Sequence, residues 1–198
     1  MVSVTIIGVA LLIYASFWLW YIGFSRTINP ELVDQVMDTI SASNSALTTD
    51  THRKNFKHFL ENDDGKDFVM VNLLRLKRPT AESRKNLGIY SKVFLGSLLK
   101  RAGHPVAQAQ AAAGKIEFVD IPEEQEWDSA FFVRYRSRKD FAEIILETAG
   151  SEHHNLKIAS LERTFAFPAS PWFIFGGPKL LAPLVLALCA SLLHILFV

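Results

Sequence analysis

The sequence has a single cysteine and almost no net charge. Because Cys189 is alone, no intrachain disulfide forms, and its place inside an apolar run gives no information about the redox compartment. The formal net charge is only +1, and no basic stripe with interleaved aromatic residues occurs, which argues against a nucleic-acid interface. P-loop, dinucleotide-binding and G-x-S-x-G motifs are absent too. No motif therefore names a reaction.

Metal-binding patterns are also missing. His153 and His154 are adjacent, so on a helix their side chains point in different directions and do not share a metal ion. His52 and His58 do not have the spacing of a helical metal motif, and no C-x-x-C pair occurs. We therefore expect neither a metal nor a cofactor.

Charged side chains are lacking in two long apolar runs, residues 2–24 and 180–198. Each run is long enough to cross a hydrocarbon core of ~30 Å as a helix. The first has no basic start and no cleavage motif, and its end carries Trp18, Trp20 and Tyr21 as an interfacial aromatic belt. We expect a transmembrane helix over residues 1–25, and an interfacial segment followed by a second transmembrane helix over residues 171–198.

Two spans place both termini on one side of the membrane and the central domain on the other. Basic residues that flank the spans on the domain side are Arg26, Lys157, Arg163 and Lys179, whereas the terminal tails carry none. This bias predicts that the domain lies on the cytoplasmic side of a bacterial-type inner membrane. Membrane lipid is then an expected partner.

The charged region between the spans predicts a helical linker and one α+β domain. Asn29 and Pro30 are a typical helix start, and Asp50 is expected to cap a second linker helix, so residues 26–65 form the linker. Alternation and helical periodicity then divide residues 66–170. The expected strands are 67–77, 104–110 with 115–120 as its continuation or hairpin partner, 127–136 and 162–168. The expected helices are 83–102, one starting at Ser137 with Asp140 as its capping box and closed by Gly150, and 152–160.

This order predicts a ferredoxin-like βαββαβ domain with its helices on one face of an antiparallel sheet. The other face is left open, and we expect it to be buried against a second copy or a larger membrane complex.

Strand alternation assigns the side chains to the two faces. Toward the helices we place Val69, Val71 and Leu73 of the first strand and Phe131, Val133 and Tyr135 of the third. The opposite face then holds Asn72 together with Arg134, within otherwise apolar surroundings. The candidate ligand-pocket residues are Asn72, Arg134, Tyr90, Gln108 and Phe132. The alternative, which we favour, is that these polar groups bond each other or a partner subunit. The "RSRK" run at 136–139 is predicted to be a helix-capping turn rather than an anion site.

Four stretches of residues 67–168 together resemble an uncharacterised bacterial family, a domain of unknown function in the dimeric α/β-barrel superfamily. They are "FVMVNLLRLK", the Tyr90-x-x-x-Phe94 helix, "EWDSAFFVRYRSRKDF" and "LERTFAFP". The resemblance implies that two sheets pack face to face into a barrel. The superfamily includes small monooxygenases, isomerases, haem-degrading enzymes and binding proteins, so the fold alone implies no single activity.

Two hypotheses for function follow. In the first, the chain is a membrane-anchored homodimeric accessory, scaffold or small-molecule-binding subunit. In the second, it is a cofactor-independent monooxygenase-like or isomerase-like enzyme for a lipophilic, quinone-like substrate, with Arg134 and Asn72 polarising an oxygen atom. The lack of an assembled acid–base set favours the first.

Overall fold

The computed structural model describes residues 2–24, 27–43, 49–149, 151–171, 174 and 176–198. The chain divides into two compact units. One comprises Met1–Phe24 and Trp172–Val198, and the other, which we call the domain, comprises Ser25–Pro171.

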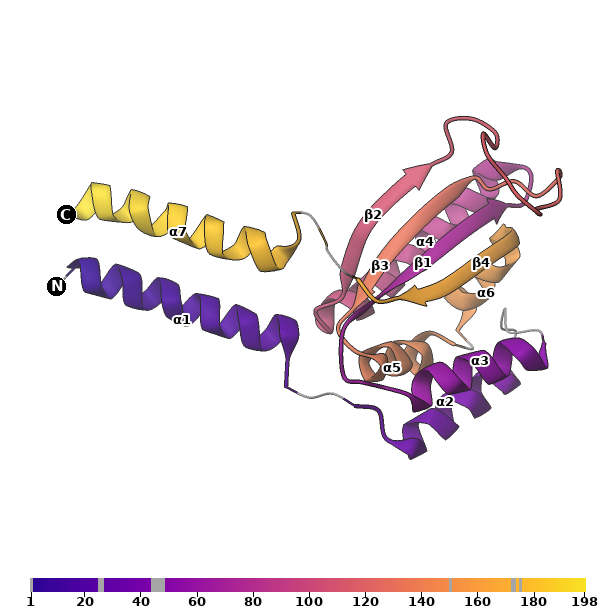
Figure 1. Ribbon diagram of the computed structural model, residues 1–198, viewed down its shortest axis with the longest axis horizontal. Coiled ribbons are helices and arrows are strands. Elements are labelled where there is room, and N and C mark those ends of the chain that lie inside the picture. Colours follow the sequence, from indigo (N-terminus) through magenta and orange to yellow (C-terminus); the bar gives the residue numbers. More distant parts are fainter. Residues whose placement is uncertain (1, 25–26, 44–48, 150, 172–173, 175) are drawn as a thin grey trace. The chain divides into compact units, whose positions relative to one another are not determined.

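The first unit consists of helices α1 (Val2–Ile22) and α7 (Pro178–Phe197), which contact each other and lie side by side (Figure 1). Both are long and apolar enough to cross a membrane, judged by length and composition. Trp18 and Tyr21 lie in the last turns of α1, where Tyr21 stacks on Phe17 with ring centroids 5.3 Å apart. Arg26, predicted to flank this helix, is outside the described residues.

The domain contains one four-stranded antiparallel sheet in the order β2-β3-β1-β4 (Figure 1). One helix follows β1, and two lie between β3 and β4. The strands are β1 (Phe68–Leu76), β2 (His104–Gln110), β3 (Ser129–Tyr135) and β4 (Leu161–Ala169). The helices are α2 (Pro30–Ala42), α3 (Asp50–Glu61), α4 (Thr80–Lys100), α5 (Arg138–Thr148) and α6 (Glu152–Ser160). The predicted α+β class and the four strands at these places in the chain are confirmed.

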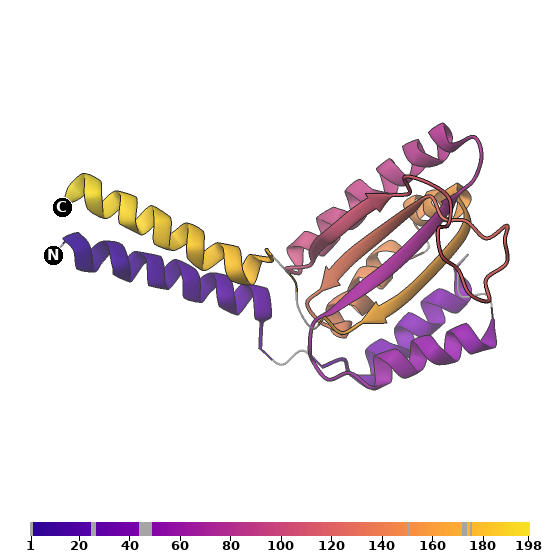
Figure 2. The same cartoon turned by 45° about the horizontal axis from the view of Figure 1, so that its top comes forward.

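The main core lies between this sheet and helices α4 and α5, on what we call the helix face (Figure 2). Phe68 of β1 and Tyr135 of β3 stack with ring centroids 5.1 Å apart. Leu98 of α4 and Ile144 of α5 pack against them and are almost fully buried. Each such side chain removed from water stabilises the fold by about 1.5–3 kcal/mol.

The strand register shows which residues of β1 face the helices. Phe68 is opposite Tyr135 and Met70 is opposite Val133, and directly opposed residues of an antiparallel pair share a face. The helix-face prediction for β3 is therefore confirmed, but the one for Val69, Val71 and Leu73 is wrong. β1 is apolar on both faces, so its sequence carries no alternation that fixes which set points inward. We call the face of Val71 and Leu73 the open face.

Two further predictions change, and a third concerns a residue outside the described part of the chain. Residues 115–120 form no strand, because β2 ends at Gln110 and a long loop, residues 111–128, leads to β3. The N-cap of α3 is Thr49, whose side chain accepts a hydrogen bond from the backbone N–H of His52, and Asp50 is the first helical residue. Gly150, expected to end α5, lies outside the described residues.

The linker helices α2 and α3 pack against α5. Val36 and Leu60 are fully buried with Ala142, which joins the predicted linker to the sheet-bearing part of the domain. Arg138, at the start of α5, donates a hydrogen bond of 2.6 Å from Nη1 to the Phe59 carbonyl near the end of α3, and another to the Asn62 carbonyl.

Candidate functional site

Arg134 lies near the end of β3 and is 1% exposed. Its place opposite Val69 puts it on the face away from Tyr135, as predicted. The guanidinium donates from Nε to Asp67 Oδ2 at 2.8 Å and from Nη1 to the Ala102 carbonyl at 2.8 Å. A buried arginine needs such acceptors, and here the protein itself supplies them.

Asn72 lies on the other side of the sheet. It is opposite Phe131 and so shares the helix face, and its Nδ2 donates to the Met70 carbonyl at 3.1 Å. The prediction that Asn72 and Arg134 share a face is therefore wrong. The cause is the one-residue error in the assignment of β1, since a shift of one residue moves a whole strand's side chains to the opposite face.

The other three candidates are dispersed as well. Tyr90 lies on α4, stacks on Phe94 with ring centroids 5.6 Å apart, and has Lys157 Nζ 5.3 Å from its ring centroid. Gln108 is exposed on the edge strand β2 and opposes Phe131, which places it on the helix face. Phe132 opposes Val71 and so lies on the open face. The structure thus does not bring the five predicted pocket residues together.

Tyr135 contributes a buried phenol to the helix side of the sheet. Burial, and secondarily the charge of Tyr90, raise the pKa of Tyr135 well above its usual value. The phenol is therefore neutral at physiological pH and serves as a packed core group rather than as a base.

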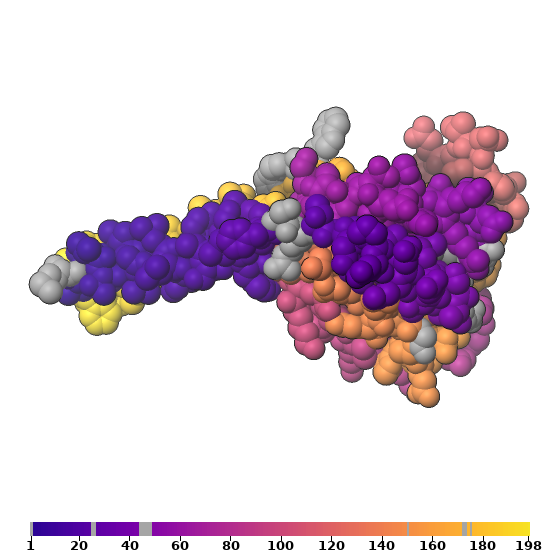
Figure 3. Space-filling model, turned by 90° about the horizontal axis from the view of Figure 1, so that it is seen from below, coloured from indigo at the N-terminus to yellow at the C-terminus, as the bar shows by residue number. Residues whose placement is uncertain are grey.

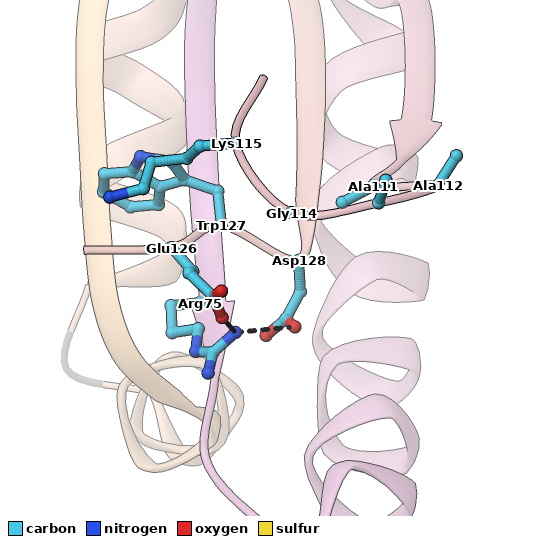
Figure 4. A pocket seen from close by; sticks show the side chains of 9 residues that line it. Arg75, Ala111, Ala112, Gly114, Lys115, Glu126, Trp127 and Asp128 are labelled. Atoms are coloured by element: carbon cyan, nitrogen blue, oxygen red, sulfur yellow. Dashed lines mark hydrogen bonds and ion pairs between the residues drawn. The ribbon is translucent and has the colours of Figure 1, made fainter. Parts of the chain in front are cut away.

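A cavity of about 350 Å³ lies at the end of the open face where β1 stops (Figure 4). Its lining residues are Arg75, Ala111–Lys115 and Glu126–Asp128. Arg75 Nη1 lies 3.2 Å from Glu126 Oε2 and 3.3 Å from Asp128 Oδ1. Sequence reasoning missed this cluster. The only signal was the "WD" pair before β3 and the arginines that close β1.

Asp128 is the centre of that cluster. One carboxylate oxygen accepts the Leu76 N–H at 2.7 Å, and the other accepts Arg78 Nη2 at 3.1 Å. Burial alone would raise the pKa of Asp128, but these hydrogen bonds and the charges of Arg75 and Arg78 lower it overall. Asp128 is thus an ionised anchor of the loop, and not a proton donor at neutral pH.

A second cavity of about 400 Å³ lies at the other end of the sheet. Phe59, Phe68, Arg138, Asp64, Lys66, Asp67 and residues 168–171 line it. Arg138 stacks on Phe59 at 4.5 Å from the ring centroid, while its donors are directed to carbonyls at the end of α3. Its side chain therefore fastens two helices together.

The "RSRK" turn is confirmed as a capping structure. Ser137 is the N-cap of α5, and its Oγ accepts the Asp140 N–H at 3.0 Å. Arg136 and Asp140 form a buried ion pair with two hydrogen bonds of 2.8 Å. This bidentate geometry fixes the strand-to-helix turn.

The open face of the sheet carries a row of apolar side chains on β4, β1 and β3. Phe165 and Phe167 of β4 are 53% and 43% exposed, and their ring centroids are 5.7 Å apart. The register places them beside Leu73 and Val71 of β1, and Phe132 continues the row on β3. Contiguous exposed apolar surfaces are typical of interaction sites in soluble domains.

Comparison with known proteins identifies the fold but no function. No family model and no curated protein matches the chain. The chain is similar to the solved structure of RPA0582, a protein of unknown function from Rhodopseudomonas palustris, with a TM-score of 0.51 at 22% identity over 61% of this chain and 93% of that one. The methylated form of that protein gives a TM-score of 0.51 at 22% identity over 63% and 93%. A NIPSNAP-like domain protein from Burkholderia xenovorans gives 0.38 at 13% identity over 57% and 90%.

Proposed function

We propose that this chain is a membrane-tethered protein whose ferredoxin-like domain pairs with a second copy into a dimeric α/β barrel. In this role it serves as an accessory, scaffold or small-molecule-binding subunit of a membrane assembly. The observation that carries the proposal is the apolar open face of the sheet. The strand order β2-β3-β1-β4 with antiparallel neighbours also supports the topology, because a βαββαβ chain produces this order.

Pairing through the open face would bury side chains that a single copy leaves in water. Phe165 and Phe167 are the most exposed of these, and Val71, Leu73 and Phe132 are half-buried around them. Sheets that pack face to face lie ~10 Å apart with interdigitated side chains. At about 25 cal/mol per Å² of apolar surface, covering such a face strongly favours association.

A membrane tether is supported by α1 and α7, each long and apolar enough to span a bilayer. Tryptophans near the end of α1 fit an interfacial position. Lys157, Arg163 and Lys179 lie on the domain side of the two spans, which favours a cytoplasmic domain in a bacterial-type inner membrane.

The enzymatic alternative requires Arg134 and Asn72 to act on one substrate oxygen. They lie on opposite faces of the sheet, and Arg134 is already bonded to Asp67 and Ala102. This geometry favours the subunit role over a monooxygenase-like or isomerase-like reaction.

The dimer is tested on the full chain in detergent by analytical ultracentrifugation. We expect the wild type to be a dimer, and Phe167→Asp to dissociate it because a carboxylate replaces a buried ring. Ile89→Asp is the matched control, since Ile89 is 40% exposed on α4, away from the open face. A monomeric wild type, or equal behaviour of the two variants, would contradict the proposal.

The subunit role is tested by native mass spectrometry of the protein released gently from its membrane. A second protein at fixed stoichiometry is the expected result. A bound small molecule that is lost in Phe132→Ala, with no protein partner, would instead support the small-molecule-binding form of the role. A homodimer free of both would contradict it.

A further inference from the structure

The loop between β2 and β3 displays apolar side chains to solvent. Ile116 is 94% exposed, Val119 81%, Phe118 47% and Ile121 41%. The loop projects from the domain as a separate salmon-coloured lobe in Figure 3. Single exposed apolar residues are ordinary, but four within one short loop segment mark a surface that another molecule covers.

Polar contacts hold this loop at its base and across its tip. At the base, Asp128 accepts the Leu76 N–H, and its own N–H donates to the Leu74 carbonyl at 2.8 Å. Across the tip, Lys115 Nζ donates to the carbonyls of Pro122 and Glu123 at 2.8 and 2.6 Å. The apolar side chains are thus presented by a braced loop, which lowers the entropic cost of docking.

The loop lies at one end of the sheet, and both connections to the terminal helices lie at the other. β4 ends at Ala169, opposite Val69, and the incoming chain is held where the Ile28 N–H donates to Asp63 Oδ2 at 2.8 Å. The loop instead joins β3 at Ser129, opposite Leu74. Val69 and Leu74 are about 17 Å apart along β1 at the rise of an antiparallel strand. We call the loop end distal.

Symmetry then constrains how two copies meet. If the terminal helices of both copies lie in one membrane, the connections keep the same end of both sheets together, so the two-fold axis of the proposed dimer runs along the strands. Consider two sheets that face each other with their strands parallel to this axis. The 180° rotation about the axis then places the β2–β3 edge of one copy over the β1–β4 edge of the other. The loop of each copy therefore meets the distal ends of β1 and β4 of its partner.

We propose that residues 115–121 of each protomer dock on a second copy of this chain, at the distal ends of its β1 and β4. The inference rests on the proposed membrane-tethered dimer and identifies its second contact. Each contact occurs twice in the symmetric dimer, and together the two loops close the distal end of the barrel.

The receiving surface matches the loop in polarity and charge. Phe165 offers an exposed ring on β4, and Arg163 beside it makes no ion pair with any residue in the described part of the chain. The loop brings apolar Ile116 together with the exposed carboxylates of Glu117 and Asp120. Arg75 at this strand end is already paired with Glu126, Asp128 and Glu162, so Arg163 and the exposed Phe165 ring are the groups that complement the acidic apolar loop.

The first test measures dimer dissociation of the full chain in detergent by analytical ultracentrifugation. Ile116→Asp is expected to weaken the dimer by at least about tenfold, as loss of a central apolar contact does. Ile89→Asp, the same change at an exposed isoleucine of α4, is expected to leave it unchanged. Equal dissociation constants for the two variants would overturn the inference.

The second test exchanges charges across the contact. Glu117→Arg and Arg163→Glu should each weaken the dimer, and the double variant should recover most of the loss, because the two sites face each other between copies. A double variant no tighter than the weaker single variant would overturn the contact.

Failure of the inference and failure of the proposed dimer give different results. If Phe167→Asp dissociates the dimer while Ile116→Asp and the charge variants do not, the open-face dimer stands and the loop contact is wrong. A wild-type monomer at all concentrations overturns both. Circular dichroism spectra that match the wild type show that each variant is folded.

Discussion

Arg134 and Asp67 form a salt bridge of 2.8 Å in which the arginine is 1% exposed and the carboxylate side chain is 21% exposed. The pair joins the end of β3 to the residue just before β1. It lies on the side of the sheet away from Tyr135, with the Ala102 carbonyl as a further acceptor. The positive charge of Arg134, which the sequence analysis considered as part of a ligand pocket, is thus paired with Asp67 within the protein itself.

Removing the carboxylate should destabilise the domain more than removing the arginine. Asp67→Asn leaves a buried guanidinium without its counter-charge and should lower the free energy of unfolding by about 3 kcal/mol. Arg134→Met leaves Asp67 partly in water and replaces the charge by an apolar side chain, so its cost should be smaller. Urea unfolding followed by circular dichroism measures both, and a larger loss in Arg134→Met would show that the ion pair itself is not the main contribution.

Gly103 marks a close approach of backbone to backbone. A Cβ there would lie 2.9 Å from the Arg134 carbonyl oxygen and 2.4 Å from Leu98 Cδ1. Gly103→Ala should therefore lower the melting temperature. Gly96→Ala is the matched control, because nothing lies within 4 Å of a Cβ built at this position of α4, and inside a helix alanine is favoured over glycine by about 1 kcal/mol. Opposite shifts are expected, and a stabilised Gly103→Ala variant would contradict the packing described.

Stability should fall on mild acidification through His104. Burial is the largest cause and lowers the pKa of His104. The hydrogen bond with the Pro105 carbonyl raises this pKa, the charge of Arg134 lowers it and the charge of Asp67 raises it, so that the pKa is lowered overall. Because the folded pKa is below the unfolded value of ~6.5, the unfolded chain binds the proton first. The stability that His104 contributes is therefore fully present above pH ~6.5, and it is lost as the pH falls toward the folded pKa.

His104→Gln should remove that component of the pH dependence. Melting temperatures between about pH 7.5 and 5 should fall less steeply in this variant than in the wild type. His52→Gln, at an exposed position of α3, serves as the control and should keep the wild-type slope. Parallel slopes in all three proteins would refute a role for His104.

Asp128 should stabilise the domain because its carboxylate accepts a hydrogen bond from the Leu76 N–H. Asp128→Ala leaves that buried donor without an acceptor and should cost about 1–3 kcal/mol, whereas Asp128→Asn keeps one acceptor oxygen and should cost less. Since the folded pKa of Asp128 is lowered, its contribution is present above pH ~3.9 and is lost as the pH falls through the folded value. Chemical unfolding at pH 7 and pH 3 measures both effects. Equal losses in the two variants at pH 7 would count against the hydrogen bond.

Much of the secondary structure was predictable because its signals are local. Asn29 before Pro30, and Ser137 three residues before Asp140, begin helices in the sequence and in the structure. Their side-chain oxygens bond backbone N–H groups within one turn, so no distant residue is needed. The prediction of a strand over residues 115–120 was wrong because an alternating apolar pattern indicates a strand even where no neighbouring strand is available to pair with it.

The candidate site was less predictable because it depends on contacts between distant residues. The apolar run of β1 fits either face, and only its pairing with β3 placed Asn72 beside Phe131 and Val69 beside Arg134. The partner of Arg134, Asp67, is far away in the chain, and nothing near Arg134 in the sequence indicates it.

The sequence by itself determined the two apolar terminal helices, the α+β class and the order of the strands, since composition and periodicity along the chain suffice for these. Tertiary structure alone decided which side of β1 is inside, because hydrogen bonding between strands sets the register. It also decided that Arg134 bonds to Asp67, and that the apolar segment from Ile116 to Ile121 lies outside the core. These outcomes depend on which surfaces meet in space, and a linear pattern does not encode that.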